Sequence, residues 1–428
     1  MSTVHKAAAA GESIGVPLVL GLQRLSALGR RISWIGRSPV LVAACQSLVS
    51  DFGFQPFPPG VSRPRIASGE IGLAYRPDPA VQAWAAANGI SLALPPGDVV
   101  DAAGNKARLL GLARVAGVTT PSATVLDRAT EDAAAVLWPP ANGALVAQLL
   151  DDDLTGAGTR LVESAAELRA CLAAWRCRPV KVAELVTGLP LTVSGCVGRE
   201  SVLVSGVSHQ LVGYPRLTSL WGRHCGNQLV GDAELPQGAG SGCRRACLAL
   251  GRALRDTGFR GMFGVDLVAT AGGVVAIEIN PRIQSVSSLL AWDEARSGFL
   301  PLPFAHLLEF AGRLPEPVVA GSAGTCLSQV VLYARDGGSV HEPLPAGRYV
   351  LGRGGMRPAP RDVIDLPSLG PEEALVWPFV AGGDQFEAGE RLAILQFARR
   401  VAPVDGGRQL HEWTEPWLAA VESKLGAR

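Results

Sequence analysis

Four polar residues near the middle of the chain have the types and the spacing of a metal site. Asp266 and Glu278 each lie in an apolar stretch, and Gly272-Gly273 joins the two stretches. This pattern predicts a two-stranded hairpin. Asn280 follows Glu278 by two residues, so both side chains are expected on one face of the second strand. Two carboxylates and an amide oxygen suit a hard divalent cation, Mg²⁺ or alternatively Mn²⁺.

Arg282 continues this spacing and would bring a fixed positive charge beside the cation. A metal ion and an arginine together neutralise the charge that phosphoryl transfer concentrates. The alternative is a buried hairpin whose two acids pair with neighbouring residues. A buried carboxylate is costly without a partner, so two of them on adjacent strands favour the metal site.

The run Glu278-Ile-Asn-Pro-Arg-Ile-Gln284, with an aspartate twelve positions before its glutamate, resembles the metal-binding segment of the ATP-grasp superfamily. The resemblance covers about residues 100–312. It implies that Asp266, Glu278 and Asn280 hold the metal, that Asn280 and Arg282 act in catalysis, and that Arg282 and Gln284 contact substrate. ATP would be the nucleotide.

Residues 105–117 predict an amphipathic helix that Gly117 ends, with one apolar face made by Leu109, Leu110, Leu112, Ala113 and Ala116. Lys106 stands near its start. In the ATP-grasp family a lysine at this place contacts the nucleotide phosphate. The alternative is a solvated lysine in a first helical turn, where the helix dipole mildly disfavours it.

A strand over residues 144–150 is followed by a glycine-containing loop. The loop matches the family's phosphate-covering loop and offers Thr155, Gly156, Gly158 and Thr159, whose backbone amides and hydroxyls could approach phosphate. Relatives place a second cationic residue on the preceding strand, where this chain has Gln148. The resemblance therefore assigns Gln148 to the nucleotide site and leaves Arg160 or Lys181 to supply the missing charge.

Residues 181–188 resemble the family's hinge strand, which holds adenine. Glu184, Leu185 and Val186 are the matching residues. Relatives often follow the hinge with a second glutamate that binds ribose, whereas this chain continues with Leu189-Pro190-Leu191. A buried edge strand without a ligand is the alternative interpretation.

Patterns elsewhere predict an α/β protein with three domains, a small N-terminal α/β domain over 1–100, an ATP-grasp domain over 101–312 and a small C-terminal α/β domain over 313–428. Residues 1–30 predict an extension that leads into a short helix. Residues 209–229 predict a substrate-binding loop in which Arg223 and His224 would meet a carboxylate or phosphate. In the C-terminal part, strands are expected over 325–333, 348–351 and 374–380. Helices are expected over 391–400 and from Thr414, as N-cap, to Lys424.

Composition excludes several classes of function. The 428 residues carry a net charge of +1 with 18% charged residues, which gives no nucleic-acid footprint. No apolar run is long enough for a membrane span. Eight cysteines without a C-x-x-C pair, and no secretory signal, indicate reduced thiols and a cytoplasmic protein. Four lysines against thirty-five arginines, with abundant alanine and glycine, suggest a GC-rich bacterial genome.

The resemblance implies a shared reaction, in which a carboxylate takes the γ-phosphoryl group of ATP and an amine then displaces phosphate from the acyl phosphate. The small-molecule partners would be a carboxylate and an amine or peptide, most like the peptide or amino-acid ligases of bacterial specialised metabolism. Several relatives are dimers, so a homodimer stays open. The alternatives are a carboxylase, another acyl-phosphate-forming transfer, and a non-catalytic nucleotide-binding module. Biotin carboxylase relatives place a glutamate base where this chain has Ser285-Val286-Ser287, which disfavours bicarbonate as substrate.

Overall fold

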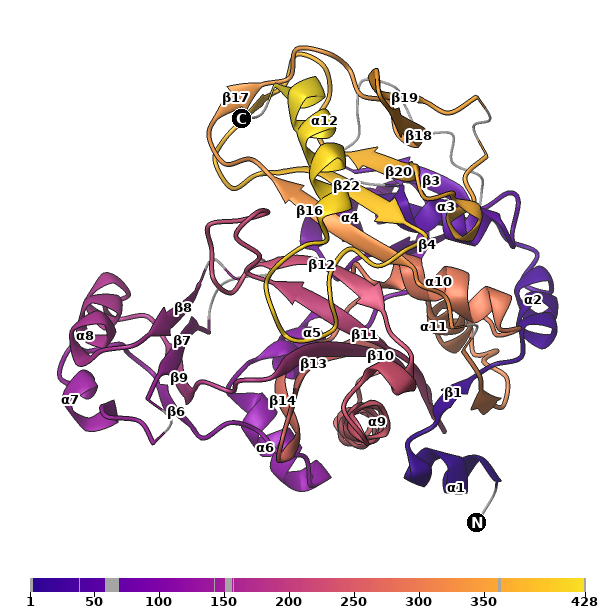
Figure 1. Ribbon diagram of the computed structural model, residues 1–428. Helices are drawn as coiled ribbons and strands as arrows, with labels where there is room; N and C mark the ends of the chain where they lie inside the picture. Colours follow the sequence, from indigo (N-terminus) through magenta and orange to yellow (C-terminus); the bar gives the residue numbers. More distant parts are fainter. Residues whose placement is uncertain are drawn as a thin grey trace.

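The structure is a computed structural model that describes residues 3–37, 39–57, 69–141, 143–150, 156, 158–322, 324–360 and 363–426. Most of its strands join one long sheet (Figure 1). Along this sheet the strand order is β14-β13-β10-β11-β12-β16-β22-β20-β18-β19. Its first five strands are β14 (Gly273–Asn280), β13 (Gly261–Thr270), β10 (Leu189–Val197), β11 (Val202–Val212) and β12 (His224–Leu229). The fold is a mixed α/β architecture, as the sequence predicts.

Helix α9 (Ala239–Asp256) covers one face of these strands, and the site lies on the other face. Cys243, Cys247, Leu250 and Leu254 recur at helical spacing and are fully buried against the sheet. Side chains alternate along a strand, so Val193 and Val265 join this core. The neighbouring polar residues of the same strands point away from α9. Helices α10 (Ser287–Arg296) and α11 (Leu302–Phe310) complete this region.

The N-terminal part contains a parallel four-stranded sheet of order β3-β2-β4-β5, as predicted. Its strands are β2 (Ile32–Gly36), β3 (Gly53–Pro56), β4 (Ile71–Ala74) and β5 (Ser91–Leu92), with α3 (Val40–Gln46), α4 (Pro79–Ala87) and α5 (Gly97–Gly104). Asp78 caps α4 by accepting hydrogen bonds from the amides of Ala80 and Val81.

Residues before this sheet are more structured than the predicted extension. They form α1 (Thr3–Ala10), β1 (Ser13–Gly15) and α2 (Leu18–Ser26). Strand β1 pairs with β11 and with β15 (Val318–Ala320), so it belongs to the long sheet. A three-residue strand has too little pattern to read from sequence, and only its distant partners define it.

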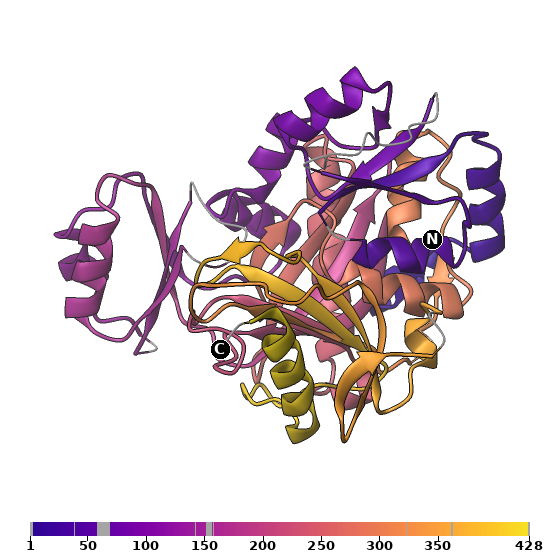
Figure 2. The same cartoon turned by 90° about the horizontal axis from the view of Figure 1, so that it is seen from above.

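Residues 123–184 form a separate lobe that stands away from the rest of the molecule (Figure 2). Its antiparallel sheet has the order β6-β9-β7-β8. The strands are β6 (Ala123–Leu126), β7 (Leu145–Leu149), β8 (Thr159–Val162) and β9 (Val180–Glu184), and α7 (Ala133–Leu137) and α8 (Ala165–Ala174) pack on them. Before the lobe comes α6 (Arg108–Ala116), which begins three residues later than predicted and ends at Gly117 in the left-handed conformation.

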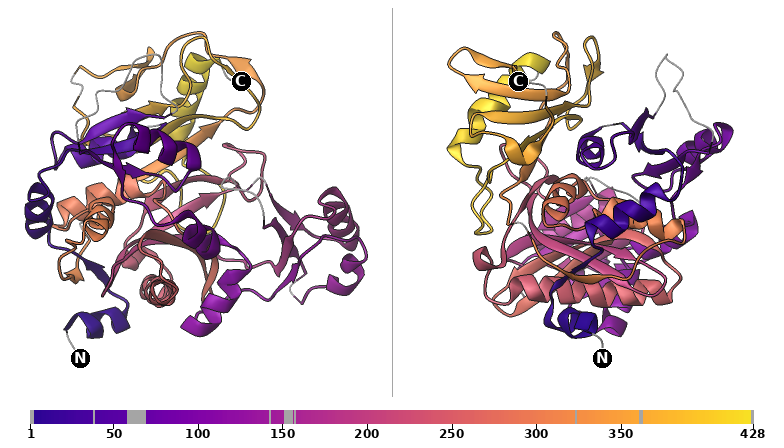
Figure 3. Two further views of the ribbon diagram at one scale, coloured as in Figure 1. Left: turned by 180° about the vertical axis from the view of Figure 1, so that it is seen from behind. Right: turned by 90° about the vertical axis from the view of Figure 1, so that its right-hand side faces the viewer.

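The C-terminal strands extend the long sheet, because β16 pairs with β12. These strands are β16 (Ser328–Tyr333), β18 (Gly347–Gly352), β19 (Gly355–Pro358), β20 (Glu373–Pro378) and β22 (Arg391–Phe397), and the short β17 (Gly338–Ser339) and β21 (Gln385–Phe386) pair separately. Helix α12 (Glu415–Leu425) packs on them through Trp417, Leu418 and Val421. Thr414 precedes it at the predicted N-cap position, but its hydroxyl donates to the carbonyl oxygen of His411 and does not cap the helix. Figure 3 shows this part and the N-terminal part side by side above the central strands. Single 3-10 turns span Asp232–Glu234, Leu366–Ser368 and Glu412–Thr414.

Two sequence predictions about secondary structure are wrong. Residues 391–397 form β22 rather than a helix. Ile394 packs in one core and Leu392, Ala393 and Leu395 in another, so both faces are apolar and the strand shows no alternation. Residues 209–229 are also not one loop, because β11 continues to Val212 and β12 begins at His224. Only 213–223 connect them.

All eight cysteines are free thiols. No helix in the described ranges has both the length and the apolar character that a bilayer crossing requires.

Candidate active site

A cavity of about 500 Å³ lies between the lobe and the long sheet. It brings together segments that are far apart in sequence. The lobe and hinge contribute Gln148, Gly156, Thr159, Lys181, Glu184, Leu185 and Val186; the hairpin and the segment after it contribute Asp266, Glu278, Asn280, Arg282, Gln284 and Ser285. Lys106 lines it as well. The C-terminal strands close its far end with Val331, Tyr333, Arg391 and Ile394.

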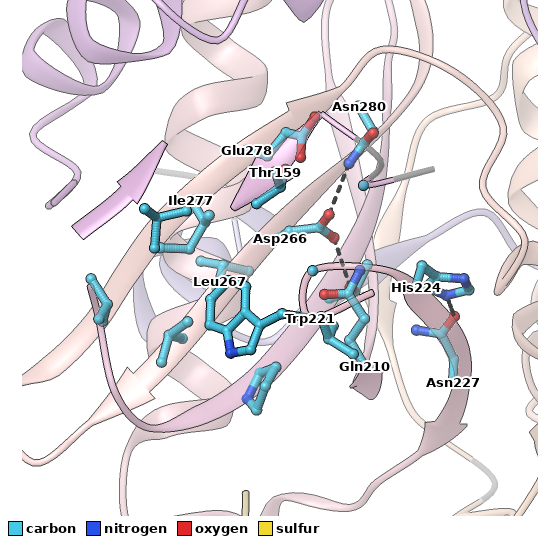
Figure 4. A pocket seen from close by; sticks show the side chains of 18 of the residues that line it. Thr159, Gln210, Trp221, His224, Asn227, Asp266, Leu267, Ile277, Glu278 and Asn280 are labelled. Carbon is cyan, nitrogen blue, oxygen red and sulfur yellow. Dashed lines mark hydrogen bonds between the residues drawn. The ribbon is translucent and has the colours of Figure 1, made fainter. Parts of the chain in front are cut away.

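The predicted hairpin is present, and its register places the two carboxylates opposite each other. Asp266 on β13 faces Glu278 on β14, and the pairing shifts by one residue immediately after this pair. The amide of Asn280 donates to Asp266 Oδ2 at 3.0 Å, and the Thr192 hydroxyl donates to Asp266 Oδ1 at 2.8 Å. Figure 4 shows Asp266, Glu278 and Asn280 pointing toward one another, with Gln210 on the other side of Asp266.

Asp266 is half-buried, and the neighbouring Glu278 disfavours its charge. Burial, and then the proximity of Glu278, raise the pKa of Asp266 to about 6, while hydrogen bonds from Thr192 and Gln210 oppose this shift. Two facing carboxylates and an amide oxygen fit a divalent cation with oxygen ligands. Among the described residues, no cluster of three or more histidine, cysteine, aspartate or glutamate side chains forms an alternative centre.

Arg282 is held by residues on both sides. It donates to Asn280 Oδ1 at 2.9 Å and to the hydroxyl of Tyr75, and its guanidinium lies 4.7 Å from the centre of the Tyr75 ring. Tyr75 follows β4 directly and comes from the N-terminal part of the chain. Sequence reasoning missed it. The available signal was its place after a strand of a parallel sheet, where ligand sites gather.

Gln284 and Gly264 form one packed pair under the hairpin. The side-chain oxygen of Gln284 accepts a hydrogen bond from Ser194 Oγ at 2.8 Å, and the residue is 8% exposed. A β-carbon at position 264 would lie 1.8 Å from that oxygen, so only glycine fits there. Gln284, which is predicted to contact substrate, lines the cavity, and its side chain is held in one position by these contacts.

Lys106 and Lys181 both point into the nucleotide end of the cavity. Lys106 is 8% exposed and lies 3.5 Å from the carbonyl oxygen of Leu149. Lys181 is 1% exposed and pairs across the strands with Gln148. Burial lowers the pKa of Lys181, the nearby Glu278 raises it, and Lys106 lowers it further. Both ammonium groups are therefore close together and close to the hairpin.

Arg160, the other candidate for the missing cation, is exposed and does not line the cavity. Its guanidinium lies 5.8 Å from the Trp175 ring and donates to the carbonyl oxygen of Thr159. Of the two cations that the sequence left as alternatives, Lys181 lines the cavity and Arg160 is not among its lining residues.

The glycine loop approaches the cavity at two described positions. Gly156 and Thr159 line it, and Gly158 is buried beside them. Gly156 has a φ of +74°, and a β-carbon there would lie 2.4 Å from the carbonyl oxygen of Gly222. Glycine is thus required by both conformation and space. Thr155 lies outside the described residues.

The hinge residues Glu184, Leu185 and Val186 line the cavity where β9 ends. The amide of Leu185 already donates to the carbonyl oxygen of Ala144 at 3.1 Å. Pro190, in the segment where the resemblance led us to expect a ribose-binding glutamate, also lines the cavity.

Arg223 and His224, the two residues of the 209–229 segment predicted to bind substrate, lie in different surroundings. His224 lines the cavity and donates from Nε2 to Asn227 Oδ1 at 2.7 Å. Burial lowers the pKa of His224 to about 4, so its imidazole is neutral at pH 7. Arg223 does not line the cavity. Its guanidinium lies 4.6 Å from the Tyr333 ring and donates to Gly389 O, which is a packing role.

Comparison with known proteins agrees with this geometry. Residues 103–286 match the family model of the ATP-grasp domain. This segment of the chain is therefore similar to the ATP-grasp domain. No curated protein sequence is detectably similar to it.

Solved structures share the fold at low sequence identity. A carboxyaminoimidazole ribonucleotide synthase from Aspergillus clavatus, complexed with ATP, aligns with a TM-score of 0.59 at 14% identity, over 92% of this chain and 99% of that chain. A phosphoribosylamine–glycine ligase from Thermotoga maritima aligns with a TM-score of 0.55 at 15% identity, over 92% and 96%. A biotin carboxylase from Campylobacter jejuni aligns with a TM-score of 0.55 at 11% identity, over 90% of this chain and 85% of that chain.

Proposed function

We propose that this protein is an ATP-dependent carboxylate–amine ligase that forms an amide bond through an acyl phosphate. The observation that carries the proposal is the convergence of Asp266, Glu278, Asn280 and Arg282 in one cavity with two buried lysines. A non-catalytic nucleotide-binding module would not require this set, because binding alone does not need a metal-and-arginine centre beside the phosphates.

The nucleotide end of the cavity divides into three parts. Glu184, Leu185 and Val186 would hold adenine at the hinge. Lys106 and Lys181 would contact phosphate oxygens, and Gly156, Gly158 and Thr159 would cover them. Asp266, Glu278 and Asn280 would hold Mg²⁺ or Mn²⁺, which neutralises phosphate charge when bound.

In the first step, an oxygen of the substrate carboxylate attacks the γ-phosphorus of ATP, and ADP leaves. In the second step, an amine attacks the acyl carbon, the C–O bond to phosphate breaks, and the amine loses a proton. Arg282 can donate two hydrogen bonds to the oxyanion of the tetrahedral intermediate. Tyr75 and Asn280 fix its orientation before substrate binds, so little reorganisation is needed during the reaction.

Carboxylation is the main competing function, since biotin carboxylase and carboxyaminoimidazole ribonucleotide synthase share the fold. A fold at this identity hosts several reactions, so the site must decide. Ser285 lines the cavity where the resemblance to biotin carboxylases would place a base. The hydroxyl of Ser287 accepts a hydrogen bond from the backbone amide of Gln284. The lack of an acid at this position favours an amine over bicarbonate.

Several finer assignments are part of the same proposal. The product would be peptide-like, made from an amino acid or small acid and an amine or peptide in bacterial specialised metabolism. The enzyme would work in the cytoplasm, with a homodimer as its candidate assembly. The segment 101–312 would act as the catalytic domain, with 1–100 and 313–428 closing the acceptor end.

The decisive experiment measures ADP release with Mg-ATP across pools of amino acids, small aromatic acids and short peptides, with products identified by mass spectrometry. We expect a condensation product whose mass equals the two substrates minus water, formed in step with ADP. ADP release that depends on bicarbonate and gives no condensation product would instead establish a carboxylase. Tight Mg-ATP binding without ADP release in any pool would support the binding module.

A further inference from the structure

The end of the cavity farthest from the hinge is built by three adjacent strands. β12 contributes His224 and Asn227, β16 contributes Val331 and Tyr333, and β22 contributes Arg391 and Ile394. The register pairs Val331 with Ile394 and Tyr333 with Arg391. Two cross-strand pairs therefore form one wall, with an apolar pair next to a polar pair.

This end carries positive charge that no acidic side chain of the cavity wall balances. The carboxylates that line the cavity are Glu184, Asp266 and Glu278, and all three belong to the hinge or the metal hairpin. Within the described residues, Arg391 forms no ion pair with a carboxylate; its guanidinium lies 5.0 Å from the Phe379 ring. Arg282 donates to Tyr75 and Asn280, both of which are uncharged.

The two guanidiniums face a common space. Both Arg391 and Arg282 disfavour protonation of His224, so both lie within electrostatic range of its imidazole. Burial lowers the pKa of His224 to about 4, so its imidazole adds no charge at pH 7. Arg391 also interacts with the hydroxyl of Tyr333, which is 5% exposed and fixed by donating to the carbonyl oxygen of His224 at 2.9 Å.

Charge balance then limits what this end can bind. Arg282 stands beside the metal hairpin and is committed to the reacting group. Arg391 offers a planar fork of N–H donors, which matches the two oxygens of one carboxylate. Arg408, a third arginine that lines the cavity, lies 5.0 Å from the Trp221 ring. Val331 and Ile394 lie beside it and offer an apolar surface to a short carbon skeleton.

We propose that Arg391 binds a carboxylate that does not react, so that one of the two substrates is an acid with a second functional group. This inference rests on the proposed ligase function and specifies its substrate class. Two sources share this chemistry. The carboxylate is either that of a free amino acid whose amine is the acceptor, or the second carboxylate of a dicarboxylic donor.

Isothermal titration of the protein saturated with Mg²⁺ and a non-hydrolysable ATP analogue tests the proposal without requiring turnover. The probes are free amino acids, their α-amides, small dicarboxylic acids and the half-amides of those acids. We expect at least one acid to bind, and its amide to bind roughly 10- to 100-fold more weakly, because the amide removes the charge that Arg391 neutralises. Whether amino acids or dicarboxylic acids bind identifies the source.

Arg391→Gln should weaken binding of the acid by a similar factor and should no longer distinguish the acid from its amide. Arg391 is exposed, so this variant should fold normally and bind the nucleotide with unchanged affinity. Arg357→Gln, an exposed arginine of β19 outside the cavity, is the matched control and should bind the acid like the parent protein.

Three results would overturn the proposal. These are equal binding of acid and amide by the parent protein, unchanged acid binding in Arg391→Gln, and no binding of any acid in the panel. Each can occur while ADP release and product formation still establish a ligase. Conversely, carboxylate binding that depends on Arg391, without ADP release in any substrate pool, would support the subsite and contradict the ligase.

Discussion

Replacing Lys181 by methionine tests whether the second phosphate-binding cation has moved to a neighbouring strand. The sequence resemblance predicts a cation on the strand before the glycine loop, where this chain has Gln148. The two residues are cross-strand partners on β7 and β9, so Lys181 reaches the same region from the adjacent strand. Methionine keeps the length and volume of the side chain and removes only its charge.

The size of the effect follows from the burial of Lys181. A hydrogen bond between charged partners contributes about 1.5–3 kcal/mol. Lys181 is 1% exposed, so solvent screens its attraction for phosphate weakly. Since 1.4 kcal/mol corresponds to a tenfold change, Lys181→Met should raise the Kd for Mg-ATP by roughly 10- to 150-fold.

The nucleotide-free protein should respond in the opposite direction. Burial lowers the pKa of Lys181, which means that the folded protein pays a desolvation cost for its charge. Lys181→Met should therefore leave the melting temperature of the free protein unchanged or raise it, while the increase produced by Mg-ATP becomes smaller.

Titration calorimetry and thermal melting measure these two effects on the same samples. Arg160→Gln is the matched control, because Arg160 is exposed and outside the cavity. It should leave the Kd for Mg-ATP unchanged. An unchanged Kd in Lys181→Met, or a raised Kd in Arg160→Gln, would refute the assignment.

Four further outcomes are expected. Asp266→Asn combined with Glu278→Gln should abolish ADP formation and keep the circular dichroism spectrum; parental turnover in this variant would contradict the metal site. Arg282→Lys should lower kcat with little change in ATP affinity, because an ammonium cannot reproduce the planar fork; a raised KM alone would assign Arg282 to ground-state binding. The pKa of about 6 for Asp266 lies above its unfolded value, so its contribution to the stability of the metal-free protein is present below about pH 4 and is lost as pH rises through 6. Mg²⁺ with ADP should therefore raise the melting temperature more at pH 7.5 than at pH 5, and equal gains would argue against binding at Asp266. Trp417→Ala should lower the free energy of unfolding by about 3–5 kcal/mol, because Trp417 is 1% exposed and packs 5.8 Å from Phe397; a change below about 1 kcal/mol in chemical denaturation would show that this core tolerates the cavity.

The sequence by itself determined the parts of the site that lie close together in the chain. Asp266, Glu278, Asn280 and Arg282 fall within seventeen residues. The strand period places Glu278 and Asn280 on one face, and the short Gly272-Gly273 connection brings the strand of Asp266 beside them. The position of helix α12 directly after Thr414 was also readable.

Only the tertiary structure decided which distant residues complete the site. Tyr75 and Arg391 carry no local signal, since a tyrosine after a strand and an arginine before an apolar run are common. The run Leu392–Phe397 was misread because a strand buried on both faces loses the alternation that identifies strands. The place of Lys181 beside Gln148 likewise follows from the pairing of β7 with β9. Pairing between strands is non-local, so the spacing of residues along one segment contains no information about it.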